Sequence, residues 1–383
     1  MFTQNLQEDF SKAQQDFLAY AKSSELLHGE LEEASVFFQA SVVQNLIAFG
    51  AEHNEFLEQI AETFSAIGSM DIYRGCLTGY LIGLYGESEI TSENADRALA
   101  AFFQHVLGLC EQYMALVCQR IGATVEQLEE DDVLAEKFYQ FSPDSLWEEE
   151  PTLVKAWMGI SMLSLGLMSR ISSSRPLREL LRSADRIAER CFYLDSYCDT
   201  VGFVPHILNM VEEETVLLLS PATKNGVEVS LREIDSNNLF FTLLQFTLYH
   251  EHLLKPLGAQ PFTYREVVER IARHEPVEEE EWPEQLYESG CFGYYTYPAL
   301  QPDGSYNEMG TVWGEGTLYE VPKLDGRYVI LLTKPNIQRS WGNAFVTSTH
   351  SRLQPEVKLI RRLSKEETEE WLEKIRAVRN THC

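Results

Sequence analysis

Residues Glu214 to Lys255 read ETVLLLSPATKNGVEVSLREIDSNNLFFTLLQFTLYHEHLLK, and this stretch decides the fold of the C-terminal half of the chain. It contains two β-rich runs joined by a turn that includes Gly226. Apolar and polar residues alternate from Val227 to Arg232, which predicts a strand with one buried face and one solvated face. Asp235 or Ser236 then caps a long apolar helix. A hairpin that leads into a buried helix predicts an α+β domain.

The N-terminal half is helical by pattern. From Thr3 to about Tyr197, apolar residues recur at helical spacing between turn signals. A chain of 383 residues exceeds the usual size of one domain. We therefore expect an all-α helical bundle over 1–204, followed over 205–383 by an α+β domain with a mainly antiparallel sheet.

Local signals mark several individual elements. Glycines at 75, 79 and 83 would form a smooth stripe on a helix, which predicts close packing against another helix. Thr124 with Gln127, and Ser364 with Glu367, form capping boxes. The other expected elements are helices over 26–50, 176–199, 262–273 and 365–378, and strands over 291–297, within 310–319, over 327–334 and over 356–362.

The charge of the chain is strongly unbalanced. Its 59 acidic and 31 basic residues give a formal net charge of −28. Such a field repels phosphate backbones and excludes direct nucleic-acid binding unless a local basic patch defeats it. The same field speeds association with a basic protein partner. Excess carboxylates also keep a protein soluble without any partner.

Cysteine usage and the N-terminal sequence predict a cytoplasmic location. The number of cysteines is seven, and no CxxC pair occurs among them. We expect reduced, buried thiols rather than disulfides or a zinc site. The first residues, MFTQNLQEDF, lack the features of a signal peptide. The most apolar helical run, Trp157 to Met168, is too short to span a bilayer, so no membrane association is expected.

Motifs for catalysis or metal binding are missing from the sequence. The GxSxG, GxGxxG and P-loop patterns do not occur. His250 and His252 are two residues apart and face away from each other on a helix, which disfavours a metal site. Asp195 or Asp199 could pair with His206 for acid/base work, but no nucleophile stands at a recognisable spacing. We expect no catalytic residue, no metal and no cofactor.

The residues most typical of a binding site are clustered late in the chain. Tryptophan, tyrosine and arginine dominate binding hot spots, and neighbouring glycines let a partner approach the backbone. Here they occur around WGEG at 313–316 and RSWGN at 339–343. The alternative is a structural glycine turn, a paired arginine and packed aromatic rings. The predicted binding residues are Tyr295, Trp313, Glu315, Arg339 and Trp341.

These same motifs carry a resemblance. WGEG at 313–316, the following LYEVPKLDGRYVILLTKP and RSW at 339–341 resemble a C-terminal module of uncharacterised bacterial proteins. In that module, a hairpin similar to LLLSPATKNGVEVSLREI precedes a helix. The likeness covers roughly Val216 to Leu372 and leaves the helical half uncovered. It implies a bacterial origin and a C-terminal domain, and it carries no activity.

Together these features favour a non-enzymatic interaction protein. The most concrete form is an immunity or antitoxin-like protein whose acidic surface masks a basic partner such as a toxin. The alternative is an enzyme or small-ligand-binding protein whose site at the domain junction would use Trp313, Glu315, Arg339 and Trp341, with His206 from the linker. A third interpretation is a scaffold that associates through the glycine stripe at 75–83.

Overall fold

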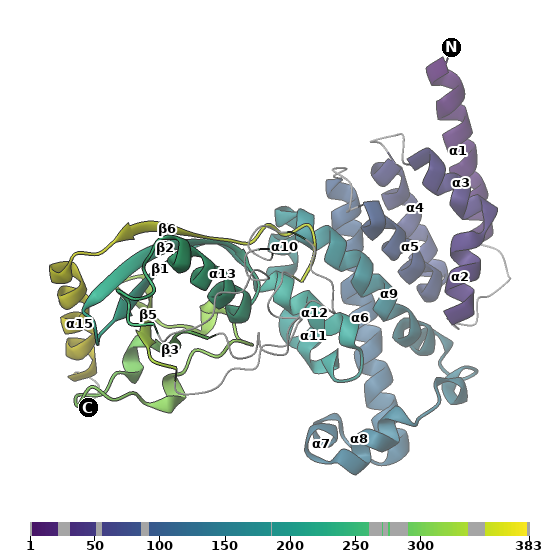
Figure 1. Ribbon diagram of the computed structural model, residues 1–383. Coiled ribbons are helices and arrows are strands. Elements are labelled where there is room, and N and C mark those ends of the chain that lie inside the picture. The colour runs from purple at the N-terminus through teal and green to yellow at the C-terminus, as the bar shows by residue number, and fades with distance from the viewer. Residues whose placement is uncertain are drawn as a thin grey trace. The chain divides into compact units, whose positions relative to one another are not determined.

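The computed structural model describes residues 2–21, 31–50, 56–85, 92–184, 186–259, 270, 275, 290–335 and 349–380 (Figure 1). The chain divides into two compact units, Met1–Leu208 and Asn209–Cys383. The boundary expected after residue 204 falls inside α12 (Asp199–Leu208), because that helix continues to the end of the first unit.

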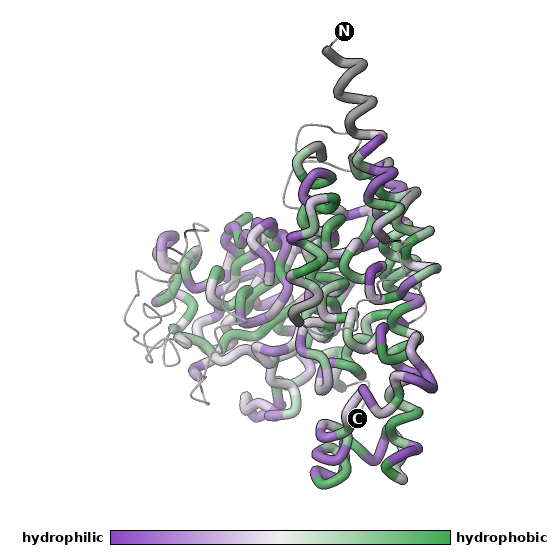
Figure 2. The backbone as a smooth tube through the Cα atoms, turned by 90° about the vertical axis from the view of Figure 1, so that its right-hand side faces the viewer, coloured by the Kyte–Doolittle hydropathy of each residue, from purple (hydrophilic) through white to green (hydrophobic). Residues whose placement is uncertain are grey.

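The first unit is helical throughout the residues that the structure describes. Its longest members are α6 (Glu93–Ile121) and α9 (Pro151–Ser173). Figure 2 shows hydrophobic and hydrophilic colour alternating along helices near the N-terminus, as expected when one face of a helix is buried. The remaining elements are α1 (Phe2–Ala21), α2 (Leu31–Gln39), α3 (Ser41–Gly50), α4 (Phe56–Met70), α5 (Ile72–Leu84), α7 (Val125–Glu130), α8 (Asp132–Tyr139), the 3₁₀ helix η2 (Pro143–Leu146), α10 (Arg175–Arg182) and α11 (Ile187–Asp195).

Two expected long helices are broken in the structure. The helix expected over 26–50 consists, in its described part, of α2 and α3, which meet at Ala40. The helix expected over 176–199 is likewise divided into α10 and α11. Arg186 lies before α11 with a φ of 51°, a left-handed conformation that cannot continue a right-handed helix. The capping box at Thr124 and Gln127 is confirmed.

The glycine stripe brings α5 against α9. A Cβ atom at Gly83 would lie 2.1 Å from the Cα of Gly166, and one at Gly79 would lie 2.4 Å from a methyl carbon of Leu163. Side chains larger than hydrogen are therefore excluded at this crossing. The predicted close packing is confirmed, and the stripe is buried inside its own unit.

The helix α9 is longer than the apolar run that predicted it. Within the described residues it is the one helix long and apolar enough to cross a membrane, and half of its most apolar window is buried inside the unit. The core helix of a soluble bundle has the same properties. Arg170 near its C-terminal end is fully buried, and its guanidinium donates to Asp96 on α6 from Nε at 2.9 Å and from Nη2 at 2.6 Å. Ser174 donates to the other carboxylate oxygen of Asp96, so α6, α9 and the start of α10 are fastened at one point.

The second unit is built around a six-stranded mixed sheet. Its strand order is β3-β5-β1-β2-β6, and β4 pairs with β5 beside this path. The pairing of β1 with β5 is parallel, and the other four pairings are antiparallel. This confirms the α+β class with a mainly antiparallel sheet. The elements are β1 (Val211–Ser220), β2 (Asn225–Ile234), α13 (Asn237–His250), β3 (Gly293–Thr296), β4 (Lys323–Leu324), β5 (Arg327–Thr333), β6 (Glu356–Arg362), α15 (Lys365–Asn380) and the 3₁₀ helices η5 (Tyr297–Ala299), η6 (Glu308–Gly310) and η7 (Leu318–Glu320).

Helices cover both faces of the sheet. One core joins the face that contains Val229 to the apolar side of α13, and a second core joins the face that contains Leu217 to α15. The expectation that β2 has a solvated face holds at Arg232, which is exposed, and is wrong at Glu228. Glu228 on that face is only 8% exposed, and it accepts hydrogen bonds from Arg327 at 2.6 Å and Arg361 at 2.8 Å.

Other predictions for this unit have mixed outcomes. The capping box at Ser364 and Glu367 is confirmed by hydrogen bonds of 2.7 and 3.1 Å. The strand expected within 310–319 is reduced to an isolated antiparallel bridge between Thr311 and Tyr295 of β3. The rest of the segment forms no strand, and the carbonyl groups of Gly314 and Gly316 accept hydrogen bonds from the start of α13. The helix expected over 262–273 lies outside the described residues except at position 270.

Candidate functional site

The WGEG segment forms a loop over the N-terminal end of α13. We call Trp313–Gly316 the Trp-Gly loop. Asn237 donates its backbone N–H to the Gly316 carbonyl at 2.9 Å, and Asn238 donates to the Gly314 carbonyl at 2.8 Å. The side-chain amide of Asn237 also donates to the Trp313 carbonyl at 2.9 Å. Because the first amides of a helix lack partners inside it, the loop completes the cap that Ser236 begins.

The glycines of this loop are required by close packing. A Cβ atom at Gly314 would lie 1.7 Å from Oδ1 of Asn238, and one at Gly316 would lie 2.3 Å from Oε2 of Glu320. Asn238 is buried, so a side chain at 314 is excluded, whereas the exposed Glu320 carboxylate would have to turn aside for one at 316. Packing within the unit thus explains why glycine occupies these positions, without a binding partner.

The structure separates the predicted binding residues. Trp313 is 56% exposed and Glu315 is also exposed, so both side chains are accessible on the Trp-Gly loop. Tyr295 is 3% exposed and belongs to the core on the α15 face, whereas Leu318 after the loop belongs to the core on the α13 face. Arg339 and Trp341 lie outside the described residues.

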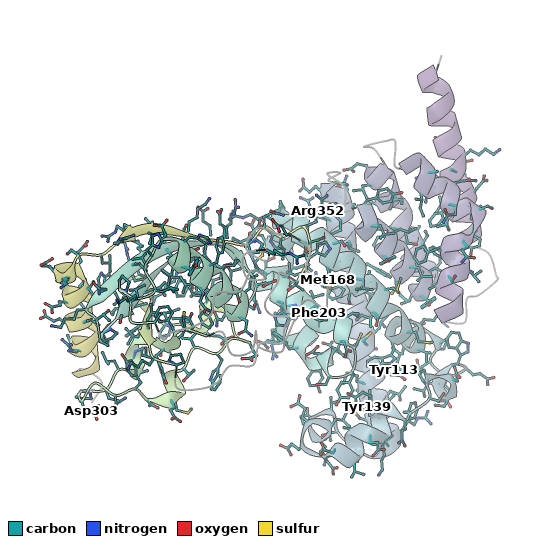
Figure 3. The ribbon with its side chains drawn as sticks, in the orientation of Figure 1. Tyr113, Tyr139, Met168, Phe203, Asp303 and Arg352 are labelled. Carbon is teal, nitrogen blue, oxygen red and sulfur yellow. The ribbon has the colours of Figure 1, made fainter. Side chains whose placement is uncertain are left out.

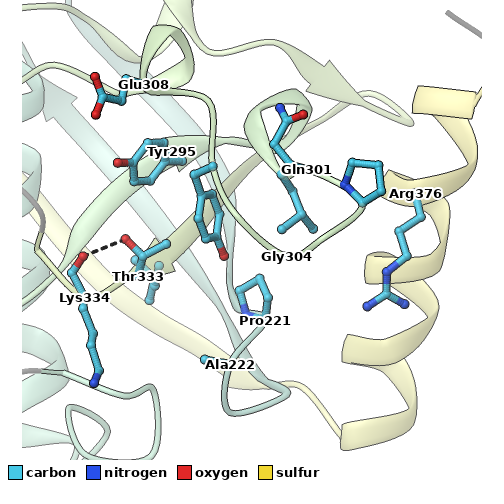
Figure 4. A pocket seen from close by; sticks show the side chains of 13 residues that line it. Pro221, Ala222, Tyr295, Gln301, Gly304, Glu308, Thr333, Lys334 and Arg376 are labelled. Atoms are coloured by element: carbon cyan, nitrogen blue, oxygen red, sulfur yellow. Dashed lines mark hydrogen bonds between the residues drawn. The ribbon is translucent and has the colours of Figure 1, made fainter. Parts of the chain in front are cut away.

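Tyr295 lines a pocket of about 610 Å³ in the second unit, which we call the tyrosine pocket (Figure 4). Its walls come from the β1–β2 turn, β3, the segment 300–308, the end of β5 and α15. The rings of Tyr295 and Tyr306 lie 4.8 Å apart between centroids. The lining residues are Pro221, Ala222, Tyr295, Leu300, Gln301, Pro302, Gly304, Tyr306, Glu308, Leu332, Thr333, Lys334 and Arg376.

The wall formed by 300–308 is held by its own hydrogen bonds. Gln301 accepts from Gly304 at 2.9 Å and donates to the Ser305 carbonyl at 2.7 Å. The carboxylate of Asp303 accepts from both the backbone and the hydroxyl of Ser305. Gly304 has a φ of 85°, which suits glycine in a tight turn. The sequence PDGS at 302–305 is typical of such a turn, and the turn gives the pocket a defined edge.

A second candidate surface lies in the helical unit. We call residues Val125–Glu150 the acidic lobe; it contains α7, α8 and η2. The lobe has ten carboxylates and one basic residue, Lys137, and all eleven of these side chains are exposed. The carboxylates belong to Glu126, Glu129, Glu130, Asp131, Asp132, Glu136, Asp144, Glu148, Glu149 and Glu150.

Some of these carboxylates stabilise the lobe itself. Asp131 caps α8 by accepting from the Val133 amide at 2.9 Å, and Glu149 forms an ion pair with Arg120. The hydrogen bonds of Glu126 lower the pKa of that carboxyl. The described part of the chain gives no hydrogen bond or ion pair to the side chains of six others, which are Glu129, Glu130, Asp132, Asp144, Glu148 and Glu150.

Apolar side chains are exposed among these charges. Val133 is 61% exposed and Tyr139 is 60% exposed, both on α8 (Figure 3). The Tyr139 hydroxyl donates to the Ser196 carbonyl, and its ring centroid lies 5.4 Å from that of Tyr197. The Tyr139 side chain is therefore held in place while more than half of it is accessible.

The described residues contain no group of three histidine, cysteine or carboxylate side chains that could hold a metal ion. His250 ends α13, and His252 follows it with a φ of 56°. Asp195 lies in the field of His206, which lowers its pKa, but the larger effect of burial raises the pKa overall. The cysteine thiols are buried as expected at 76, 110, 118, 191 and 291, and burial raises the pKa of Cys191 to about 12.

Sequence reasoning missed most of the tyrosine pocket. Tyr306 and Arg376 are 70 residues apart, and only the fold brings α15 beside the turn. The sequence EEDD at 129–132 lies in the acidic lobe, but sequence reasoning did not single out the lobe as a binding surface, and no periodic pattern marked the exposed Tyr139. Comparison with protein-family models, with curated proteins and with solved structures finds no match to this chain.

Proposed function

We propose that this chain is a non-enzymatic interaction protein of the bacterial cytoplasm that binds a basic protein partner through its acidic lobe. The observation that carries the proposal is the combination of ten exposed carboxylates with two exposed apolar side chains on one short segment. An immunity or antitoxin-like role, in which the lobe masks the basic surface of a toxin, is its most concrete form.

Charge is concentrated in the unit that carries the lobe. Residues 1–208 contain 32 acidic and 13 basic residues, a net charge of −19, whereas residues 209–383 contain 27 and 18, a net charge of −9. Like charges held close together repel and cost stability. A basic partner would relieve that repulsion, so part of the binding free energy would come from the lobe itself.

The exposed apolar side chains can contribute the affinity that surface charge alone does not provide. Screened surface charges steer a partner and speed its association, but most affinity comes from a few buried anchors. Tyr139 is suited to be such an anchor because its hydroxyl and ring contacts already hold it in one position. Little side-chain entropy would be lost when a partner covers it. Val133 is a second exposed apolar side chain on the same helix.

The lobe also has features that disfavour other ligands. Nucleic acid would meet its charge with repulsion. A divalent cation needs several oxygens converging on one point, and no such group of side chains occurs among the described residues. A protein surface rich in lysine and arginine remains the partner that fits.

The test is a capture experiment with matched variants. Tagged full-length protein is incubated with native lysate at low and moderate salt, and the bound proteins are identified by mass spectrometry. The lobe variant neutralises four lobe carboxylates that form no hydrogen bond or ion pair within the described residues, and the control neutralises four exposed carboxylates elsewhere. The lobe variant is Glu129→Gln, Glu130→Gln, Asp132→Asn and Glu148→Gln; the control variant is Asp16→Asn, Glu213→Gln, Glu370→Gln and Glu373→Gln.

We expect one basic protein to bind the wild type and the control and to be released as salt rises. The association rate constant of the lobe variant should be about tenfold lower, because steering depends on local charge. Tyr139→Ala should instead speed dissociation. Equal binding by the lobe and control variants would refute the assignment of the lobe, and capture of no basic protein would refute the proposed function.

A further inference from the structure

The tyrosine pocket has a chemistry of its own that the acidic lobe does not explain. Its volume of about 610 Å³ lies in the range typical of small-molecule sites. Apolar side chains and two tyrosine rings form much of its lining. A ligand that fills it needs an apolar or aromatic body.

Burial moves the pKa of one pocket tyrosine further above neutral pH. It raises the pKa of Tyr306 to about 12, with a further contribution from Tyr295. The Tyr306 hydroxyl therefore keeps its proton at neutral pH and can donate a hydrogen bond. The side-chain amide of Gln301 is a second donor on the same wall. Both groups suit an acceptor on the ligand.

Two cations of the pocket have no carboxylate partner in the part of the chain that the structure describes. They are Lys334 at the end of β5 and Arg376 on α15, which Figure 4 shows on different sides of the pocket. Most other described basic side chains of this unit form ion pairs. The paired residues include Lys224, Arg232, Lys323, Arg327, Lys358, Arg361, Arg362 and Lys374.

Because most cations of this unit form ion pairs, the lack of such a pair at Lys334 and Arg376 suggests that they are available to a ligand. In a unit with a net charge of −9, an exposed cation has many carboxylates available to it. Besides Lys334 and Arg376, only Lys255 and Lys365 lack a partner among the basic side chains described in this unit. Glu308 also lines the pocket, so two cations and one carboxylate leave it with a net positive charge. One negative charge on a ligand would balance it.

We propose that the tyrosine pocket binds a small organic monocarboxylate with an aromatic or apolar body. The body would lie against Tyr295, Tyr306 and Leu300. Arg376 would hold the carboxylate, since its planar fork can donate two hydrogen bonds to the two oxygens, and Lys334 would add a second positive charge. The overall charge of the chain would favour a compact monoanion over a more highly charged ligand.

The experiment uses the full chain and the probe 2-naphthoate, with binding measured by titration calorimetry. Its neutral isostere 2-naphthamide tests the role of charge, and phenyl phosphate tests the choice of carboxylate. Arg376→Gln removes the guanidinium from the pocket. Lys255→Gln changes the net charge of the chain by the same amount at an exposed position outside the pocket. Ala222→Trp fills the pocket from the β1–β2 turn.

We expect 2-naphthoate to bind at one site per chain. The affinities of 2-naphthamide and phenyl phosphate should be at least about tenfold lower, as loss of a charge-assisted hydrogen bond implies. Arg376→Gln should lower the affinity for naphthoate about tenfold and leave that for naphthamide unchanged, whereas Lys255→Gln should change neither affinity and Ala222→Trp should abolish binding of both. Should Arg376→Gln fail to fold, Lys334→Gln provides the same comparison. Equal affinity for acid and amide, tighter binding of phenyl phosphate, or no binding of naphthoate would overturn the proposal.

Discussion

Replacing one glycine of the Trp-Gly loop should loosen the start of α13. In Gly314→Ala, the new Cβ would lie 1.7 Å from Oδ1, 2.4 Å from Cγ and 2.8 Å from Nδ2 of Asn238. The new Cβ would therefore clash with the whole carboxamide group of Asn238. Asn238 is only 3% exposed, so its side chain has no free space into which it can turn. The loop and the helix must move apart.

The size of the effect follows from the bonds between them. Separation breaks the backbone hydrogen bonds from Asn237 to Gly316 and from Asn238 to Gly314, and the side-chain bond from Asn237 to Trp313. Each is worth about 1 kcal/mol when its loss leaves a buried group unpaired. We expect a loss of roughly 3 kcal/mol, which corresponds to about a hundredfold in an opening equilibrium.

Hydrogen exchange read by mass spectrometry can localise this loss. In the full chain, amides at the start of α13 should exchange about a hundredfold faster in Gly314→Ala than in the wild type. Glu315→Ala is the control, because Glu315 is exposed on the same loop and its removal should have little effect. Protection of α13 within threefold of the wild type in Gly314→Ala would refute the view that the loop holds this helix.

Two further predictions concern buried groups. Asp96→Asn leaves the Arg170 guanidinium buried beside a neutral amide and should lower the free energy of unfolding of the helical unit by roughly 3 kcal/mol or more. The control Glu93→Gln removes a surface ion pair with Arg97 and should lower it by less than about 1 kcal/mol. Equal losses for the two variants in a denaturant titration would contradict this prediction. Burial raises the pKa of Tyr113 and Tyr306 to about 12. Since an unfolded tyrosine titrates near pH 10, the folded chain retains protons that the unfolded chain has lost, and thermal melts at constant ionic strength should show stability falling as pH rises from about 10 to 12.

Local sequence signals predicted structural elements well where the structure depends on residues that are close together in the sequence. The hairpin before α13, the capping boxes and the glycine stripe all depend on nearest-neighbour geometry, and each is present in the structure. The break at Arg186 was missed because its left-handed backbone is adopted by an arginine, a residue that gives no turn signal. The second covered face of β2 was missed because α15 lies more than 130 residues later in the chain.

The candidate sites also differ in how much of each could be predicted from the sequence. The net charge of the chain predicted a basic partner but did not locate the acidic lobe, although ten carboxylates within 26 residues can be counted without a fold. The Trp-Gly loop was singled out, but its glycines pack against the start of α13 in a way that the sequence does not display. The tyrosine pocket could not be seen in the sequence because five separate segments form it. Only the accessible Trp313 and Glu315 keep the loop a candidate for binding.

The two proposed sites lie in different units, so each can be lost without the other. Neutralising the acidic lobe alters carboxylates within 125–150 and leaves Lys334, Arg376 and the tyrosine rings unchanged. The lobe variant should therefore bind 2-naphthoate as the wild type does, and Arg376→Gln should capture the basic partner as the wild type does. A change in naphthoate affinity on neutralising the lobe would show instead that the two sites are coupled through the folded chain.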